Sequence, residues 1–222
     1  MTNFDMGMEY LEPALPARAD EKPKVPYWNW PPRMDFVPDG VGAYAIDKPA
    51  PPIQDVINGG NVTVNGVDQG LGFQKGMFCA AVINLIRRAN RKIVPKEPTG
   101  DSRYDGGTWA CQRFWHPFMD PGGFNIFSVY PRGTLIGKYF EWAGDPGASE
   151  VVDQGHVVVL WDEHNLAEGK DAWVVQSHPD PAVRGLNWWT RLTESNFDPA
   201  SGNYYDYAVR PEYWIDHDMG GF

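Results

Sequence analysis

The stretch Gly76-Met77-Phe78-Cys79-Ala80-Ala81-Val82-Ile83-Asn84-Leu85-Ile86-Arg87-Arg88-Ala89-Asn90 is the longest helix-periodic segment in a sequence otherwise broken by glycine and proline. Val82, Ile83 and Ile86 recur at the three- and four-residue spacing of one helix face, which predicts a helix that buries this face. Cys79 is predicted to lie in the first turn. Unpaired backbone N–H groups and the helix dipole favour an anion there, which lowers the pKa of a thiol and favours the nucleophilic thiolate.

Cys79 also fits a second interpretation, that of a packed core residue. A free cysteine is most often a small buried apolar side chain, and the following alanines, Ala80 and Ala81, suit close packing. The helix alone leaves both interpretations open, and a catalytic one depends on partners further along the chain.

Length and composition predict a globular protein. The chain has 222 residues, 42% hydrophobic and 14% aromatic, which suits one domain with a sizeable core and an extension. Its net charge of −10 argues against a nucleic-acid partner, because contact with phosphates requires a basic surface. No apolar run approaches the ~20 residues of a membrane span, and the first residues do not resemble a signal peptide, so we expect no membrane partner and synthesis in a cytoplasm. Cys79 and Cys111 are expected to be free thiols, with Cys111 packed in the core.

Two regions differ in composition. Residues 1–52 are rich in proline and aromatic residues, and residues 53–222 form the second region, which is predicted to be the main folded domain. Prolines at this density disfavour helix and central strand, so residues 1–52 are predicted to form an extended arm. Tyr27, Trp28 and Trp30 suggest that the arm packs on another surface, and both its own domain and a partner remain open.

The second region predicts one long helix followed by a sheet. A short strand or hairpin is expected over 53–75, where Asn65-Gly66 between β-branched residues favours a tight turn, and a short helix over 109–115. Strand patterns follow at 153–161, 172–178, 185–192 and 204–210, and the first has a continuous apolar run typical of a strand covered on both faces. This order predicts an α+β fold in which the helix that carries Cys79 packs on an antiparallel sheet.

The same order provides the parts that a cysteine peptidase needs. A thiolate attacks a carbonyl carbon, a histidine moves the proton, and a third polar group orients the imidazole. His156 lies at the start of the first long strand, and the next strand pattern returns as its antiparallel partner. Gln176 and His178 lie on one face of that partner and Ser177 on the other, so either of the first two can face His156.

These motifs resemble the papain-like cysteine peptidases of the NlpC and CHAP type, and most closely the peptidase domain of lysin A endolysins from phages of actinobacteria. The likeness covers roughly residues 70–215 and leaves the proline-rich start uncovered. It rests on an ordered set of motifs: Cys79, Asn84 and Arg87-Arg88-Ala89; Tyr104-Asp105-Gly106-Gly107; Asp153-Gln154-Gly155-His156-Val157; Gln176-Ser177; Gly185-Leu186-Asn187-Trp188; Tyr204-Tyr205; Pro211-Glu212-Tyr213-Trp214-Ile215. The resemblance implies a papain-like core, with a helix carrying the cysteine packed on a sheet carrying the histidine.

The resemblance also implies residue roles, with Cys79 as nucleophile and His156 as general base and acid. Gln176 is favoured as the third member, because its carbonyl oxygen can accept from the imidazole N–H and fix the tautomer, and His178 is the alternative. Gln74 precedes Cys79 as the oxyanion-hole glutamine does in papain-like enzymes, although the spacing is one residue shorter. A solvated loop residue fits Gln74 equally well.

Candidate substrate contacts come from two further motifs. Tyr104 and Asp105 belong to a turn by composition, and only the resemblance places them in a substrate groove. Asn187 and Trp188 fit either a cleft for a peptide or glycan or a buried aromatic cluster. Both interpretations of the second pair remain open.

The leading hypothesis is a phage peptidoglycan endopeptidase of the endolysin type, which cleaves a stem-peptide or cross-bridge amide through an acyl-enzyme on Cys79 and uses no cofactor. Such an enzyme stays in the host cytoplasm until lysis and then acts on the bacterial cell wall. The alternative is a phage virion or tail-associated protein with a peptidase-like fold, either a wall hydrolase used at infection or a non-catalytic component. In that case the N-terminal arm is expected to contact phage tail proteins.

A zinc hydrolase built on His156, His178 and either Asp153 or His116 is a third hypothesis. The sequence has neither H-x-x-x-H nor H-E-x-x-H spacing to support it, so no metal site is predicted. His116, His164 and His217 lie in loop sequences and are expected to be solvated.

Overall fold

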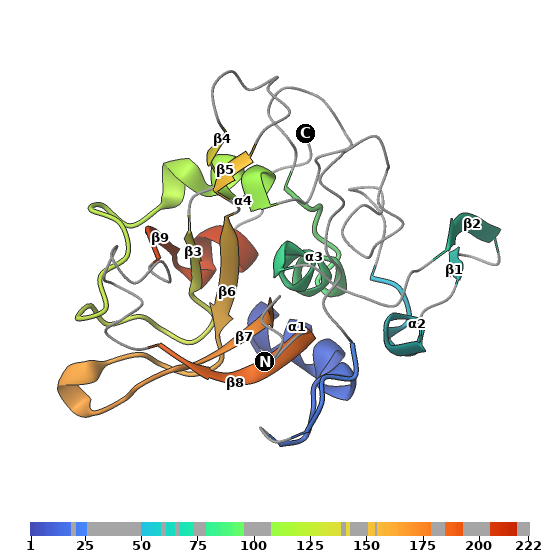
Figure 1. Ribbon diagram of the computed structural model, residues 1–222, viewed down its shortest axis with the longest axis horizontal. Helices are drawn as coiled ribbons and strands as arrows, with labels where there is room; N and C mark the ends of the chain where they lie inside the picture. The colour runs from blue at the N-terminus through green and yellow to red at the C-terminus, as the bar shows by residue number, and fades with distance from the viewer. Residues whose placement is uncertain are drawn as a thin grey trace.

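The computed structural model describes residues 1–18, 21–25, 50–58, 61–64, 67–72, 79–95, 108–138, 141–142, 151–153, 155–178, 185–192 and 205–216. Within these residues, helices surround one side of a five-stranded antiparallel sheet (Figure 1). The architecture is mixed α+β with an antiparallel sheet, as the sequence predicts.

The sheet has the strand order β8-β7-β6-β3-β9, in which each neighbouring pair is antiparallel. The strands are β3 (Leu135–Lys138), β6 (His156–Leu160), β7 (Trp173–His178), β8 (Gly185–Arg191) and β9 (Tyr207–Val209). The central strand β6 is buried from Val157 to Leu160 and contributes to two separate apolar clusters. Val157 and Val159 belong to the cluster that contains α3, and Val158 and Leu160 belong to the other, as the apolar run predicts.

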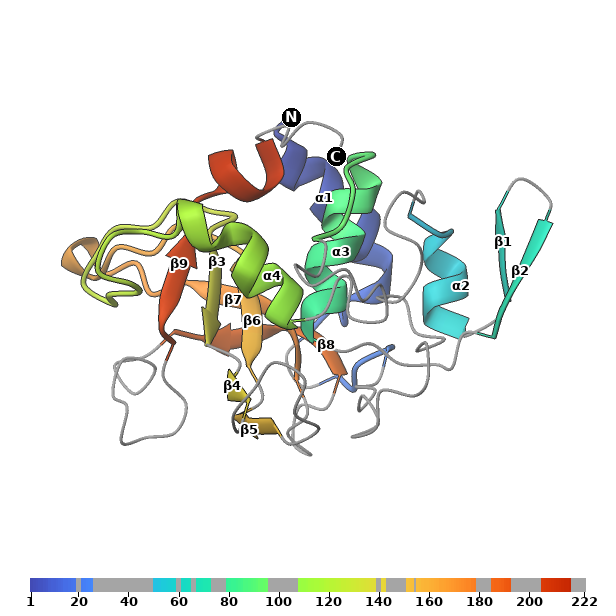
Figure 2. The same cartoon turned by 90° about the horizontal axis from the view of Figure 1, so that it is seen from above.

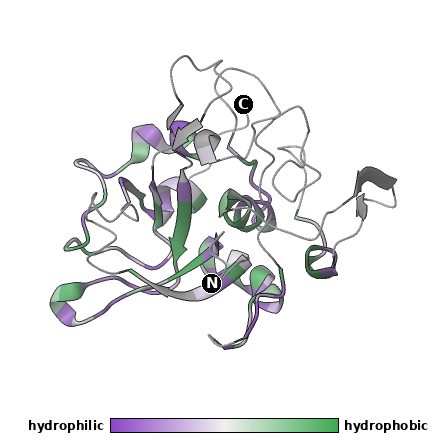
Figure 3. Ribbon diagram, viewed as in Figure 1, coloured by the Kyte–Doolittle hydropathy of each residue, from purple (hydrophilic) through white to green (hydrophobic). Residues whose placement is uncertain are grey.

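Helix α3 (Cys79–Ala89) packs against β6 and β7 and lies at the centre of the larger cluster. Figure 3 shows both α3 and β6 as predominantly hydrophobic ribbons. The helix begins at Cys79, so the predicted first-turn position of the cysteine is confirmed. The sequence predicted that α3 buries one face, whereas the structure buries the helix on all sides, because every residue from Cys79 to Arg88 is buried. Other elements of the fold must therefore cover the side of α3 that faces away from the sheet.

Helix α1 (Asn3–Leu11) supplies much of that cover, and it lies beside α3 in Figure 2. Thr2 and Asp5 form a reciprocal capping box at its start, and Phe4, Met8 and Leu11 are buried in the α3 cluster. The prediction of an extended arm is wrong for this segment, because the first proline of the chain comes only at position 13. Residues 26–49, including Tyr27, Trp28 and Trp30, lie outside the described residues.

The remaining elements flank this core. Helix α4 (Thr108–Trp115) confirms the predicted short helix, and β1 (Asn61–Val64) and β2 (Val67–Gly72) form the predicted hairpin, with Val64 paired to Val67. The turn residues Asn65 and Gly66 lie outside the described residues. Val56 and Ile57 belong to helix α2 (Ile53–Asn58) and not to a strand, which corrects the prediction there. β4 (Glu141–Trp142) and β5 (Val151–Asp153) form a second small hairpin.

Four short helical turns lie among the larger elements in the described residues. They are 3-10 turns at Glu12–Ala14, His116–Phe118 and Leu166–Glu168 and a π-helical turn at Glu212–Asp216. The last of these contributes the buried side chains Trp214 and Ile215 to the α3 cluster. None of the helices in the described part of the chain has the length and apolar character needed to cross a membrane.

Candidate active site

Cys79 occupies the first position of α3, where the helix meets the start of β6 and the start of α4. Its sulfur lies 3.3 Å from the hydroxyl oxygen of Thr108, the first residue of α4. The backbone N–H of Val157 is also directed at the sulfur. Because that N–H belongs to the peptide bond that follows His156, the fold brings the thiol to the backbone of the predicted base. The side chain of Cys79 is only 5% exposed.

His156 is the first residue of β6, and its ring contacts both candidates for the third position. Nε2 of His156 lies 2.9 Å from Oε1 of Gln176. The ring of His178 meets the His156 ring edge to face, with 5.1 Å between the centroids. Gln176 and His178 are two residues apart on β7 and share a face, which is why both reach His156. The side-chain contact that strand alternation predicted between His156 and Gln176 is present.

The hydrogen bond to Gln176 defines the tautomer of the His156 imidazole. An amide oxygen can only accept, so Nε2 of His156 carries the proton and donates it to Oε1. Nδ1 is then the nitrogen with a lone pair, and it is the atom able to take a proton from a thiol. A glutamine oxygen at this position therefore leaves Nδ1 as the nitrogen that is available to accept a proton.

The thiol and the imidazole do not form a hydrogen bond to each other among the described residues. The side-chain partner of Cys79 is Thr108, and that of His156 is Gln176. Strand alternation also assigns the His156 side chain to the face of Val158, whereas Val157 faces α3. The two side chains therefore approach the end of β6 from different sides. Catalytic hydrogen bonds are often long in enzymes without substrate and shorten when substrate binds.

Burial sets the protonation state of both groups. It raises the pKa of the Cys79 thiol, and the Thr108 hydroxyl and the Val157 N–H oppose this rise. The prediction that the first-turn position lowers the thiol pKa is therefore wrong in its net direction, because desolvation outweighs the helix start. Burial also lowers the pKa of His156, while the bond to Gln176 raises it and the charge of Lys138 lowers it further. Both shifts favour the uncharged forms, a neutral thiol and a neutral imidazole.

Of the remaining predicted site residues, Asn187 and Trp188 lie within the described part of the chain. Gln74, Tyr104 and Asp105 lie outside the described residues. Asn187 is fully buried and its amide donates to the carbonyl of Gly185 at 2.9 Å. Asn187 does not line an open surface in this structure.

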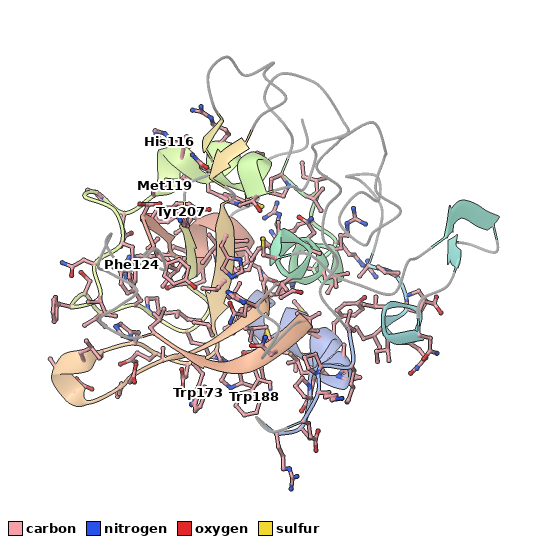
Figure 4. All side chains as sticks on the ribbon, in the orientation of Figure 1. His116, Met119, Phe124, Trp173, Trp188 and Tyr207 are labelled. Atoms are coloured by element: carbon pink, nitrogen blue, oxygen red, sulfur yellow. The ribbon has the colours of Figure 1, made fainter. Side chains whose placement is uncertain are left out.

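Trp188 belongs to an aromatic cluster on the outer strands. Its indole stacks on Trp161 with 5.6 Å between centroids and meets Trp173 edge to face, and Figure 4 shows Trp173 and Trp188 close together. The indole N–H donates to the carbonyl of Pro16 at 2.8 Å, which ties the N-terminal segment to β8. Trp161, Trp173 and Trp188 therefore form an aromatic cluster, but each of the three is only half-buried, so both interpretations of Trp188 remain predictions.

Sequence reasoning missed two residues with defined roles in the structure. Thr108 contacts the Cys79 sulfur, and its only sequence signal is a threonine at the start of an apolar helix. His164 was predicted to be solvated but is fully buried, with Nε2 2.7 Å from the carbonyl oxygen of Ile126 and Nδ1 accepting from the N–H of Ala172. Cys111 is buried and His116 exposed, as predicted, and His217 lies outside the described residues.

The described residues offer little that would hold a metal ion or a small ligand near Cys79. The described residues contain no group of three or more His, Cys, Asp or Glu side chains placed to hold a metal ion. A shallow surface depression is lined in part by Ser128, Glu163 and Arg210. It lies beyond Leu160, at the opposite end of β6 from His156. This depression is therefore remote from the Cys79 thiol.

Comparisons of the chain with protein-family models, with curated proteins and with solved structures found no match.

Proposed function

We propose that this chain is a cysteine peptidase that hydrolyses an amide bond in bacterial peptidoglycan, of the kind that phages use for lysis. The observation that carries the proposal is the hydrogen bond from His156 to Gln176 at the start of β6, the strand whose Val157 N–H is directed at the Cys79 sulfur. A thiol at a helix start, a histidine at a strand start and an amide that orients the imidazole are the three parts of a papain-like site.

The reaction follows from the assigned tautomer. Nδ1 of His156 takes the thiol proton of Cys79 as the sulfur attacks the carbonyl carbon of the scissile amide. The tetrahedral oxyanion receives a hydrogen bond from the backbone N–H of Cys79, a donor of the first helical turn. The imidazolium then gives its proton to the leaving amine, which leaves a thioester on Cys79. Water, deprotonated by Nδ1, hydrolyses the thioester and restores the thiol.

A neutral resting pair suits this sequence of steps. Because burial favours the uncharged thiol, the nucleophile forms only when a base removes its proton during the attack. For the proton transfer, the His156 ring must turn Nδ1 from the face of Val158 towards the sulfur, which lies at the N–H of the adjoining residue Val157. Bound substrate is the expected cause of that turn.

The substrate class rests on the resemblance to lysin A peptidase domains. An acidic chain with a net charge of −10 gains no electrostatic attraction to a wall that carries free carboxylates, so recognition is expected through groove contacts. Peptidoglycan is the proposed partner, and the wall is the proposed place of action after release from the host cytoplasm.

One observation favours the second candidate, a non-catalytic phage virion protein that keeps a peptidase-like fold. The Cys79 thiol is buried and bonded to Thr108 and not to His156, which is the arrangement of a packed core cysteine. The two candidates differ in whether the thiol is needed for hydrolysis.

The deciding experiment is digestion of purified actinobacterial peptidoglycan by the wild type, Cys79→Ala and Cys111→Ala. Cys111 is the matched control, because it is also buried and also borne on a helix of the same cluster. We expect new amino and carboxyl termini, identified by mass spectrometry, from the wild type and Cys111→Ala and none from Cys79→Ala. If all three folded proteins release nothing, the non-catalytic candidate replaces the peptidase. Loss of activity with a chelator and not with a thiol-alkylating reagent would support a metal hydrolase instead.

A further inference from the structure

We propose that Thr108 is a positioning residue for Cys79, which fixes the rotamer of the thiol and donates a hydrogen bond to the thiolate when it forms. This inference rests on the proposed function, because it assigns to Thr108 a role in the reaction of that thiol. The carrying observation is the separation of 3.3 Å between the Thr108 hydroxyl oxygen and the Cys79 sulfur.

The position of Thr108 is determined by α4, whose buried face anchors it in the core. Cys111 and Trp115 lie three and seven residues after Thr108 on the same side of the helix, and both are fully buried. The Trp115 ring lies under the guanidinium group of Arg87 on α3, 4.9 Å from the ring centroid. The packing of α4 therefore anchors the Thr108 hydroxyl beside the first turn of α3.

The hydroxyl serves both protonation states of the sulfur. A threonine hydroxyl is a donor and an acceptor, so it can accept from the thiol S–H at rest and rotate to donate to the thiolate. A buried thiolate needs such donors, since burial penalises the charged form. Backbone N–H groups of Val157, Ala80 and Cys79 are also directed at the sulfur, so among the described residues the Thr108 hydroxyl is the one side-chain donor in a set that is otherwise made of backbone groups of α3 and β6.

Thr108 also restricts where the thiol points. The sulfur is held at the junction of α3, α4 and β6, next to the peptide bond between His156 and Val157. Without this hydroxyl the thiol loses its side-chain hydrogen bond and is free to take other rotamers. Thr108 is therefore expected to affect both the pH dependence and the rate of thiol reactions.

The test measures thiol reactivity directly, without any peptidoglycan substrate. Three variants are compared with the wild type: Thr108→Val, which is isosteric and lacks the hydroxyl; Thr108→Ser, which keeps the hydroxyl; and Thr134→Val, the matched control. Thr134 is a buried threonine whose hydroxyl donates to the carbonyl of Pro131 at 2.7 Å, at the end of β3 remote from His156. Iodoacetamide alkylation of Cys79 is followed by peptide mass spectrometry across pH 6 to 11.

We expect Thr108→Val to shift the alkylation profile of Cys79 upward by about one pH unit, which is about tenfold slower alkylation below the pKa. Thr108→Ser should stay close to the wild type, and Thr134→Val should match it. Continued protection of Cys111 from alkylation shows in each variant that the core is folded. The proposal is overturned if Thr108→Val keeps the wild-type profile, if Thr108→Ser shifts as far as Thr108→Val, or if folded wild-type Cys79 is not alkylated.

The outcome is separable from that of the peptidoglycan digestion. The alkylation profile can shift with the loss of the Thr108 hydroxyl while the protein releases no wall fragments. That result supports the role of Thr108 at the thiol and contradicts peptidoglycan as the substrate. Wall hydrolysis that depends on Cys79, with an unchanged alkylation profile in Thr108→Val, keeps the peptidase and removes Thr108 from its mechanism.

Discussion

Nε2 of His156 donates a hydrogen bond to Oε1 of Gln176 across 2.9 Å, from the first residue of β6 to the neighbouring strand β7. The bond leaves Nδ1 as the basic nitrogen of the imidazole. His178 meets the same ring from its edge, so two side chains of β7 compete for the role of orienting group. Their contributions can be separated by substitution.

We expect Gln176→Leu to lower kcat/KM on peptidoglycan about 10²-fold, since general acid–base catalysis contributes about 10²–10⁴-fold and needs the correct tautomer. His178→Phe keeps an aromatic ring beside His156 and should cost less. Gln176→Glu keeps an acceptor and should recover part of the loss. Rates of fragment release at several substrate concentrations measure these effects. If His178→Phe lowers kcat/KM more than Gln176→Leu does, His178 and not Gln176 is the residue that orients the imidazole.

The second prediction concerns stability at low pH. Burial lowers the pKa of His156 in the folded state below its unfolded value of 6.5, and the Lys138 charge acts in the same direction. As the pH falls below 6.5, the unfolded chain binds a proton that the folded chain does not bind, so the free energy of unfolding decreases. His156→Gln removes this difference and should lose less stability than the wild type between pH 7.5 and pH 5.5. Urea unfolding at both pH values measures it, and equal losses in the two proteins would contradict the assignment.

The sequence predicted the His156–Gln176 contact because strand alternation is a local property. Residues two apart on a strand share a face whatever the rest of the fold does, so Gln176 and His178 were the two candidates before the strands were paired. The continuous apolar run of β6 likewise predicted cover on both faces. Which of the two β7 side chains bonds to the imidazole depends on how β6 and β7 are placed relative to each other at this end of the sheet. The local sequence pattern does not specify that placement.

The parts that failed depend on distant segments. The thiol pKa was predicted from the helix start alone, whereas the burial that raises it depends on how other elements close around α3. The proline content of residues 1–52 hid α1, because its capping residues Thr2 and Asp5 precede the first proline. His164 lies in a loop sequence, and its burial follows from backbone groups of Ile126 and Ala172 that converge only in the folded chain.

The third prediction tests that buried histidine. His164→Leu leaves the carbonyl of Ile126 and the N–H of Ala172 without their side-chain partner, and each unpaired buried group costs roughly 1–3 kcal/mol of unfolding free energy. His116→Leu is the matched control on the surface, where a change within about 0.5 kcal/mol is expected. Chemical denaturation measures both. If His164→Leu is as stable as His116→Leu, the two hydrogen bonds of His164 do not contribute to folding.

The last prediction tests the packing of the N-terminal helix on α3. A Cβ at Gly7 of α1 would lie 2.6 Å from Cγ2 of Ile86, and Ile86 is itself fully buried in the α3 cluster. Alanine is the better helix former by about 1 kcal/mol, so Gly7→Ala would stabilise an α1 that stood alone. In the packed structure we expect it to destabilise the protein by about 1–3 kcal/mol, because neither helix can move away without opening the core. Glu9→Ala, on the exposed side of the same helix, is the control and should be nearly neutral. A stabilised Gly7→Ala protein, with an unchanged Glu9→Ala, would mean that α1 does not pack on α3 in solution and that residues 1–18 form an arm after all.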